Sequence, residues 1–249
     1  MSATIAIIGK SGSGKTTLTN SLLTALHEAY PDKSILMVDN DLTCELGYTF
    51  GIETKDTISD IRSGKYKYKS KIPPDMTKQE FIEWALQDMV INLYDDIDII
   101  ASGMVSTKDC TCFVANQIND ALIKLFKSYD IVIFDCEYDL EYLHQLVDYP
   151  IDVTLIISDT SLTSVYSAQK IKQSSLRYSS PGQLGLVMNK VKNRQVPENV
   201  SQVLSEYDLN ILGFLPFDEE LERDNIIKDS EIVIEAAKEL MYRLNLPPL

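Results

Sequence analysis

The sequence predicts an α/β protein with a mainly parallel sheet that is flanked by helices on both faces. Short apolar runs alternate along the chain with longer stretches of helical spacing, a pattern typical of parallel sheets whose strands are buried on both sides. The composition is that of a globular protein, with 45% hydrophobic and 24% charged residues. Because no linker, repeat or low-complexity tract divides the chain, we expect a single domain over residues 1–249.

Each expected strand is a short apolar run rich in Ile, Val and Leu, and each expected helix repeats apolar residues every three or four positions. The expected strands are Thr4–Ile8, Ser34–Asp39, Ile97–Ala101, Ile131–Asp135, Val153–Ser158, Leu184–Asn189 and Ile211–Pro216. The expected helices are Lys15–Tyr30, Lys78–Leu93, Ala115–Lys127, Leu140–Val147, Leu162–Gln173 and Glu231–Leu244. The lysine-rich stretch Ser63–Asp75 is expected to be a surface loop. Ligands of such sheets bind at the carboxyl ends of the strands.

Charge and cysteine content restrict the class of protein. With 23 basic and 37 acidic residues the net charge is −14, which disfavours nucleic acid and anionic membranes as partners. No run approaches the roughly 20 apolar residues of a membrane helix. Four cysteines are too few for a disulfide scaffold in a chain of 249 residues. We therefore expect a cytoplasmic protein with reduced thiols.

The strongest local signal lies between the first strand and the first helix. The segment from Gly9 to Thr16 reads G-K-S-G-S-G-K-T and matches the phosphate-binding pattern G-x-x-x-x-G-K-[ST] at every fixed position. Its glycines let several backbone N–H groups converge on phosphate oxygens, and the helix N-terminus adds a favourable dipole. Lys15 is expected to reach the β- and γ-phosphates and Thr16 to bind Mg²⁺. The expected nucleotide-binding residues of this loop are Gly12, Ser13, Gly14, Lys15, Thr16 and Thr17.

A second lysine of the loop, Lys10, is not needed to hold nucleotide within one subunit. With it the loop resembles the deviant Walker A loop, K-G-G-x-G-K-[ST], of the MinD/ParA/NifH group of P-loop ATPases, although Ser11 replaces the first glycine of that pattern. In that group the extra lysine crosses a face-to-face dimer and contacts the partner's nucleotide. The resemblance therefore implies a homodimer with a catalytic role for Lys10. The loop also suits ordinary P-loop kinases, so a small-molecule kinase is an alternative.

Acidic residues end two of the expected strands. Asp39 and Asp41 follow the second strand, and by resemblance Asp41 orients the attacking water while Asp39 holds a magnesium-bound water. The alternative is a helix cap or a local turn. Asp135 closes an apolar strand in the Walker B pattern, where its carboxylate supports Mg²⁺. Asp139 occupies a position where many relatives have glycine, so we expect slow ATP hydrolysis.

The pair Asn189 and Lys190 closes a later strand, as in the N-K-x-D motif with which GTPases read guanine. The residue at the aspartate position is Lys192, which can only donate hydrogen bonds. Guanine recognition should therefore fail, whereas Asn189 can still pair with adenine. This favours ATP over GTP, and the alternative is an asparagine that simply ends a strand.

Cys110 and Cys112 form a Cys-x-Cys motif before an expected helix. In an extended segment residues i and i+2 face the same side, so both thiolates could bind one soft metal such as Zn²⁺ or Ni²⁺. A closed site needs about four ligands, which a twofold axis between two chains would supply. Two free thiols and a redox-active disulfide are the alternatives. Cys44 and Cys136 are interpreted as packing residues.

The order of these motifs is more specific than any one of them, and it resembles the CooC family of nickel-insertion ATPases. The matching segments are the loop with Lys10, Asp39-x-Asp41, Leu46–Gly51, Cys110-x-Cys112, Asp135-x-Glu137, Asn189-Lys190 and Ile211–Phe217. The resemblance implies an ATP-dependent dimeric metallochaperone that delivers nickel to a client such as carbon monoxide dehydrogenase. Two residues, Leu42 and Asp139, depart from the pattern of that family, and both lie in the segments that sense the nucleotide. A MinD/ParA-like positioning ATPase is the alternative.

Overall fold

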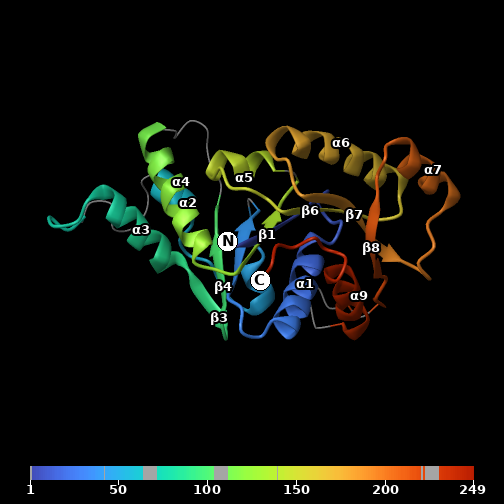
Figure 1. Ribbon diagram of the computed structural model, residues 1–249, viewed down its shortest axis with the longest axis horizontal. Coiled ribbons are helices and arrows are strands. Elements are labelled where there is room, and N and C mark those ends of the chain that lie inside the picture. The colour runs from blue at the N-terminus through green and yellow to red at the C-terminus, as the bar shows by residue number, and fades with distance from the viewer. Residues whose placement is uncertain are drawn as a thin grey trace.

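The computed structural model describes residues 2–41, 43–63, 72–103, 112–138, 140–219, 221 and 230–249, without the side chains of residues 112–114 and 142. Its strands form one eight-stranded sheet in the order β3-β4-β2-β5-β1-β6-β7-β8 (Figure 1). The strands are β1 (Ala3–Gly9), β2 (Ile35–Asn40), β3 (Ile91–Tyr94), β4 (Ile97–Ala101), β5 (Ile131–Cys136), β6 (Val153–Ser158), β7 (Gln183–Val191) and β8 (Ile211–Pro216). All neighbouring strands pair in parallel except β3 with β4, so the expected mainly parallel sheet is confirmed.

Helices cover both faces of the sheet, as expected (Figure 1). One face carries α2 (Ile58–Ser63), α3 (Lys78–Met89), α4 (Cys112–Lys127), α5 (Glu141–Leu146), α6 (Leu162–Tyr178) and α7 (Glu198–Glu206). The other face carries α1 (Lys15–Ala29) and α9 (Glu231–Met241). Alternate residues of β1 belong to two separate buried clusters: Ile5 and Ile7 pack on the α1 side, and Ala6 and Ile8 on the opposite side. This double burial explains why the strands are continuous apolar runs.

The structure corrects the expected helix Lys78–Leu93. The helix α3 ends at Met89, and the following residues form β3, which pairs antiparallel with β4. In Ile91–Tyr94 half-buried and exposed residues alternate, which is the period of a strand rather than of a helix. Three short elements were not expected from the sequence: α2, α7 and the 3₁₀ helix η1 (Gly47–Phe50). The stretch with Lys65, Lys67, Lys69 and Lys71 lies outside the described residues.

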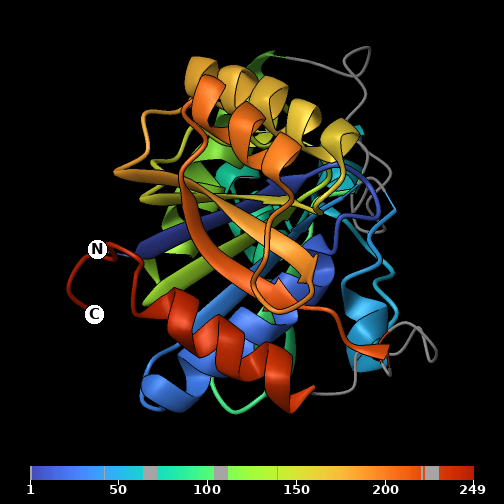
Figure 2. The same cartoon turned by 90° about the vertical axis from the view of Figure 1, so that its right-hand side faces the viewer.

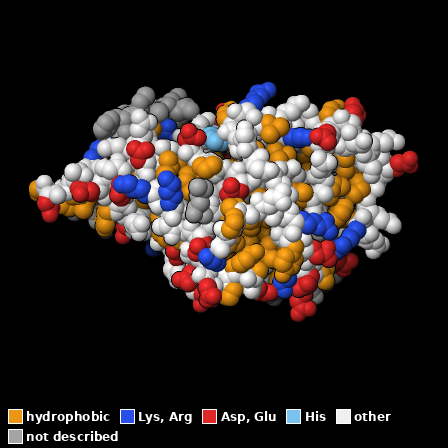
Figure 3. Space-filling view, in the orientation of Figure 1, with side chains coloured by type: hydrophobic (Ala, Val, Ile, Leu, Met, Phe, Trp, Pro, Cys, Tyr) orange, Lys and Arg blue, Asp and Glu red, His pale blue; other side chains and the backbone are white. Residues whose placement is uncertain are grey.

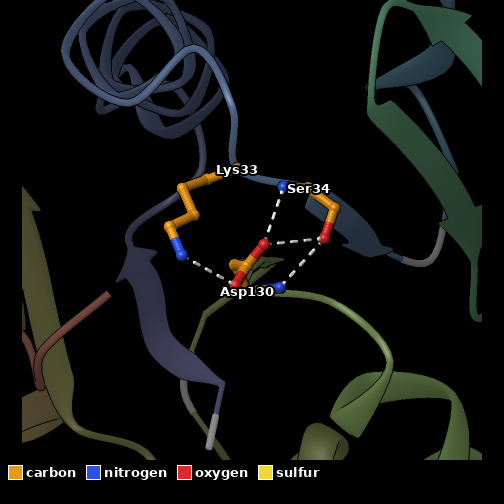
Figure 4. A network of polar contacts seen from close by, with 3 residues as sticks. All are labelled: Lys33, Ser34 and Asp130. Carbon is orange, nitrogen blue, oxygen red and sulfur yellow. Dashed lines mark hydrogen bonds and ion pairs between the residues drawn. The ribbon is translucent and has the colours of Figure 1, made fainter.

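A polar network at the amino ends of β2 and β5 fixes the alignment of these two strands (Figure 4). Asp130 accepts hydrogen bonds from the Ser34 backbone N–H at 3.1 Å and the Ser34 hydroxyl at 3.2 Å, and Lys33 Nζ lies 3.3 Å from the same carboxylate. The next residues, Ile35 and Ile131, are register partners. Four residues further on, the same register places two acidic residues side by side at the other end of the sheet.

The two ends of the sheet differ in what they carry. Figure 2 shows both chain termini at the amino ends of the strands, away from the loop between β1 and α1.

On the face seen in Figure 3, basic and acidic side chains are interspersed with apolar ones and no large basic patch is visible. No helix in the described part of the chain combines the length and the apolarity that crossing a bilayer requires.

Candidate functional site

The loop between β1 and α1 has the conformation of a phosphate cradle. Gly14 is the N-cap of α1 with a left-handed φ of 98°, and a Cβ on it would lie 2.1 Å from Asn189 Nδ2. Only glycine therefore fits this position. The Ser13 backbone N–H donates to the Lys10 carbonyl at 3.1 Å, which closes the loop, and the Ser13 hydroxyl is buried without a hydrogen-bond partner. The first helical residue, Lys15, is only 8% exposed.

A cavity of about 390 Å³ opens beside this loop at the carboxyl ends of the strands. It brings together the phosphate-binding loop, the segment after β2 and the ends of β7 and β8. The lining residues are Ser11, Gly12, Gly14, Lys15, Thr16, Thr17, Asp41, Glu45, Asn189, Lys190, Pro216, Phe217, Asp218, Leu221 and Val233. Seven of the predicted nucleotide-site residues thus share one cavity with Asp41, while Lys10 is exposed and does not line it.

Two buried carboxylates lie beneath the loop. Asp39 and Asp135 are register partners on the neighbouring strands β2 and β5, and they are 0% and 3% exposed. Burial raises the pKa of Asp39 to about 6, although the backbone N–H groups of Asp41 and Leu46 donate to its carboxylate. Burial and the nearby Asp39 charge raise the pKa of Asp135 to about 7, against the opposing effect of Lys15.

The donor atoms around Asp135 fit Mg²⁺, a cation that prefers oxygen ligands and keeps several waters. The Thr16 hydroxyl donates to Asp135 Oδ2 at 3.2 Å, so the two residues predicted to bind and support the ion are in contact. The second oxygen, Asp135 Oδ1, is buried without a hydrogen-bond partner. An acceptor oxygen that is buried and unsatisfied is costly, and a cation or a cation-bound water would satisfy it.

The raised pKa values predict how stability depends on pH. A carboxyl whose pKa is higher in the folded chain than in the unfolded chain makes the folded state bind more protons, so the free energy of unfolding falls as pH rises through about 4 to 7. Without ligand, the protein should unfold at a lower temperature at pH 7.5 than at pH 5 by this contribution. Asp135→Asn keeps an acceptor for the Thr16 hydroxyl and should stabilise the protein at pH 7.5 by about 1 to 3 kcal/mol.

Asp130→Asn is the matched control. The pKa of Asp130 is lowered, chiefly by the hydrogen bond from the Ser34 N–H, so this variant should be destabilised at neutral pH. Thermal unfolding of the wild type and both variants from pH 5 to 8 checks the signs. Equal destabilisation by both substitutions would show that Asp135 is not the origin of the pH dependence.

The segment after β2 forms a compact turn at the rim of the cavity. Asp41 Oδ1 accepts hydrogen bonds from the Thr43 backbone N–H at 2.9 Å and from the Thr43 hydroxyl at 2.8 Å. Asp41 therefore makes the local turn that the sequence left as an alternative, and it also lines the cavity. Cys44 Sγ donates to the Asp41 carbonyl at 3.5 Å, and burial raises the pKa of this thiol to about 11, which keeps it protonated.

The ends of β7 and β8 supply further residues of the cavity. Asn189 Nδ2 donates to the Ser13 carbonyl at 2.7 Å and its Oδ1 accepts from the Lys190 N–H at 2.8 Å, so Asn189 braces the phosphate loop. Lys192 lies over the ring of Phe217, 5.1 Å from its centroid, and does not line the cavity. Glu45, Pro216, Phe217 and Asp218 do line it. Pro216 and Phe217 belong to the segment Ile211–Phe217 that carried the family resemblance, whereas Glu45 and Asp218 had no sequence signal of their own.

The predicted metal site cannot be assembled from the described residues. Cys110 lies outside them, and Cys112 is the first residue of α4. In the part of the chain that the structure describes, no group of three or more His, Cys, Asp or Glu side chains is placed to hold a metal ion. Asp139 also lies outside the described residues. Cys136 is buried in the core and accepts a hydrogen bond from Asn40 Nδ2 at 3.7 Å.

Comparisons with known proteins agree with this geometry. A family model described as the CobQ/CobB/MinD/ParA nucleotide binding domain matches residues 4–228. The chain is 31% identical over 220 residues to the ATP-binding protein MJ0685 of Methanocaldococcus jannaschii, covering 87% of this chain and 85% of that protein. It is 27% identical over 251 residues to the ATP-binding protein MJ0823 of the same organism, covering 95% of this chain and 94% of that protein.

Solved structures with a similar fold include two that contain MinD. The septum site-determining protein MinD of Pyrococcus horikoshii with Mg-ADP has a TM-score of 0.66 and 19% identity, covering 96% of this chain and 94% of that chain. The MinC:MinD cell division complex of Aquifex aeolicus has a TM-score of 0.66 and 19% identity, covering 100% of this chain and 98% of that chain. At this identity the likeness concerns the fold alone. From the family match and the 31% identical relative, we conclude that the chain belongs to the CobQ/CobB/MinD/ParA family of P-loop nucleotide-binding proteins.

Proposed function

We propose that residues 1–249 form a single Mg²⁺-dependent ATPase domain of the cytoplasm, which binds ATP in the cavity beside the phosphate loop. The observation that carries this proposal is that one cavity joins Lys15 and Thr16 to Asp41. Lys15 supplies a cation for the phosphates, Thr16 a hydroxyl for the metal ion, and Asp41 a carboxylate for the attacking water. The names of the two Methanocaldococcus relatives, both called ATP-binding proteins, support ATP as the ligand.

In this proposal each residue has a defined task. The backbone N–H groups from Gly12 to Thr17 bind phosphate oxygens, and the Lys15 ammonium offsets the charge of the β- and γ-phosphates. Thr16 would hold Mg²⁺ with the support of Asp39 and Asp135, and the bound ion would neutralise charge on the phosphates. Asp41 orients a water molecule in line with the γ-phosphate. In this proposal the base lies near Asn189 and Lys190, which line the same cavity.

We propose further that ATP brings two chains together and that Lys10 acts across their interface. Lys10 belongs to the phosphate loop, yet it is exposed and does not line the cavity of its own chain. A lysine in that place costs nothing in the free chain and gains a phosphate partner only when a second chain closes over the site. Such a contact would make ATP binding and dimerisation mutually favourable.

Lys10→Ala tests this arrangement. The variant should bind ATP with nearly the affinity of the wild type in dilute solution, because Lys10 does not contact ATP within its own chain. It should remain a monomer with a non-hydrolysable ATP analogue and Mg²⁺, whereas the wild type should dimerise in sedimentation. Lys33→Ala, at the opposite end of the sheet, is the matched control and should dimerise normally. A Lys10→Ala variant that dimerises as the wild type does would contradict the role of Lys10.

A second, more specific function is metal delivery: we propose that Cys110 and Cys112 of two chains hold one Zn²⁺ or Ni²⁺ and that the dimer inserts nickel into a client enzyme. The motif joins β4 to α4, and the end of β4 touches the nucleotide site. Both the N–H and the hydroxyl of Ser102 donate to the Asp39 carbonyl, at 2.9 Å and 3.0 Å. In this proposal a change at Asp39 is passed through Ser102 to the two cysteines.

Metal titration separates this function from a MinD/ParA-like positioning role. One metal ion should bind per two chains, with proton release because the thiols must ionise, and binding should weaken at low pH. The Cys110→Ser/Cys112→Ser double variant should lose this binding while it still binds ATP, and Cys44→Ser is the matched single-thiol control. If the double variant keeps the wild-type affinity for Zn²⁺ and Ni²⁺, the metal site is wrong and the positioning role is favoured.

A further inference from the structure

The last residues of β7 and the turn that follows have an unfavourable backbone conformation. Lys190, Asn193 and Arg194 have φ values of 56°, 55° and 53°, in the left-handed region that residues with a Cβ rarely adopt. They are three of the six non-glycine residues with positive φ in the described chain. Such a concentration persists only where surrounding contacts hold it, and it is typical of functional sites. We call residues 190–194 the β7 turn.

The contacts that hold the β7 turn come from three different elements. At its start Asn189 is bonded to the phosphate loop, as described above. In its middle the Phe217 N–H donates to the Val191 carbonyl at 3.4 Å, which ties the turn to the end of β8. At its end Arg194 Nη2 lies 2.7 and 2.8 Å from the two carboxylate oxygens of Glu239 on α9. The turn is therefore fixed relative to the cavity.

One contact of the β7 turn faces Phe217. Lys192 Nζ lies 5.1 Å from the centre of the Phe217 ring, within the range at which an ammonium is attracted to an aromatic face. Lys192 is itself exposed and outside the cavity lining, whereas Phe217 is half-buried and lines the cavity. The ring of Phe217 therefore connects Lys192 to the cavity.

The cavity is lined by both polar and apolar residues. Lys15 and Thr16 mark the phosphate end, and Pro216, Phe217, Leu221 and Val233 supply its apolar lining. A purine base offers flat apolar faces that stack well on aromatic side chains. We propose that Lys192 is a positioning residue: its ammonium holds the Phe217 ring where the adenine packs, and it thereby sets the affinity for the base without touching the nucleotide. This inference rests on the proposed function, in which the cavity binds ATP.

Two probes separate the base from the phosphates. Calorimetry would compare ATP with inorganic tripolyphosphate, which has the phosphates but no base, in the presence of Mg²⁺. Lys192→Met keeps most of the side-chain length and removes the charge. It should raise the Kd for ATP about two- to fivefold, the effect of one exposed cation–π contact, and leave the Kd for tripolyphosphate unchanged. Lys192→Arg should bind ATP as the wild type does.

A double-substitution cycle completes the test. In a Phe217→Leu background, Lys192→Met should have no further effect on ATP, because the contact is already lost. Lys192 is exposed, so thermal unfolding should be nearly unchanged in the single variant. An equal loss for ATP and tripolyphosphate would show a general charge effect and overturn the proposal, as would an unchanged Kd for ATP. If the wild type binds neither probe, the proposed function itself fails, and the positioning role fails with it.

Discussion

Lys15→Ala is expected to raise the Kd for ATP by about 100-fold or more, the largest effect on binding of any single substitution in this protein. Lys15 is 8% exposed and lines the cavity beside the phosphate loop. Charge-assisted hydrogen bonds to phosphate are about twice as strong as neutral ones, and alanine offers none. Calorimetric titration with ATP and Mg²⁺ measures the loss directly.

The fold of the Lys15→Ala variant needs its own control, because Lys15 also offsets the buried Asp135 charge. Removing the cation should raise the pKa of Asp135 further, so the apo variant should be less stable at pH 7.5 than at pH 6. Comparing ATP binding at both values separates misfolding from lost phosphate contacts. A Kd within tenfold of the wild type at either pH would mean that ATP does not bind at this loop.

Asp41→Ala should leave ATP binding nearly intact and lower the rate of hydrolysis about 100-fold or more. A group that positions the attacking water contributes mainly in the transition state, so its loss appears in turnover rather than in affinity. Single-turnover measurement with ATP in the presence of Mg²⁺ is the appropriate assay, since we expect the wild type to be slow without a partner. The structure adds a complication, because Asp41 also forms the turn with Thr43.

Asp41→Asn addresses that complication. Asparagine keeps an oxygen acceptor for the Thr43 N–H and hydroxyl, so the turn persists while the negative charge is lost. If Asp41 orients water through its charge, the alanine and asparagine variants should be similarly slow and should both bind ATP. Thr43→Ala weakens the turn alone and should hydrolyse ATP at a rate close to that of the wild type. Loss of ATP binding in all three variants would assign Asp41 a structural role.

Much of the fold followed from apolar periodicity. The strands β4, β6 and β8 have the bounds expected from the sequence, because each is a short run of mainly apolar residues. The phosphate loop was predictable for a different reason: Gly14 is dictated by a left-handed backbone and by the close approach of Asn189. Such local backbone constraints can be predicted from the residue types alone.

The features of the fold and of the site that the sequence did not predict depend on contacts between segments that are distant along the chain. The strand β3 exists because β4 offers an edge for antiparallel pairing, which residues 91–94 do not reveal when read alone. The hydrogen bond from Asn189 to Ser13 spans 176 positions, so the sequence suggested base recognition where the structure has a brace for the phosphate loop. Phe217 and Asp218 entered the site for the same reason: only the fold brings the end of β8, which pairs with β7, to the cavity beside the phosphate loop.

The network of Lys33, Ser34 and Asp130 has a consequence for how this chain can vary in length. Ile35 and Ile131 begin aligned, and Asp39 and Asp135 each follow four residues later. Inserting or deleting one residue in either strand would turn its carboxylate to the opposite face of the sheet, because side chains alternate along a strand. Changes in length are thus tolerable in the connecting loops but not within β2 or β5. The equal lengths of β2 and β5, counted from the aligned pair Ile35 and Ile131, therefore keep Asp39 and Asp135 side by side at the opposite end of the sheet.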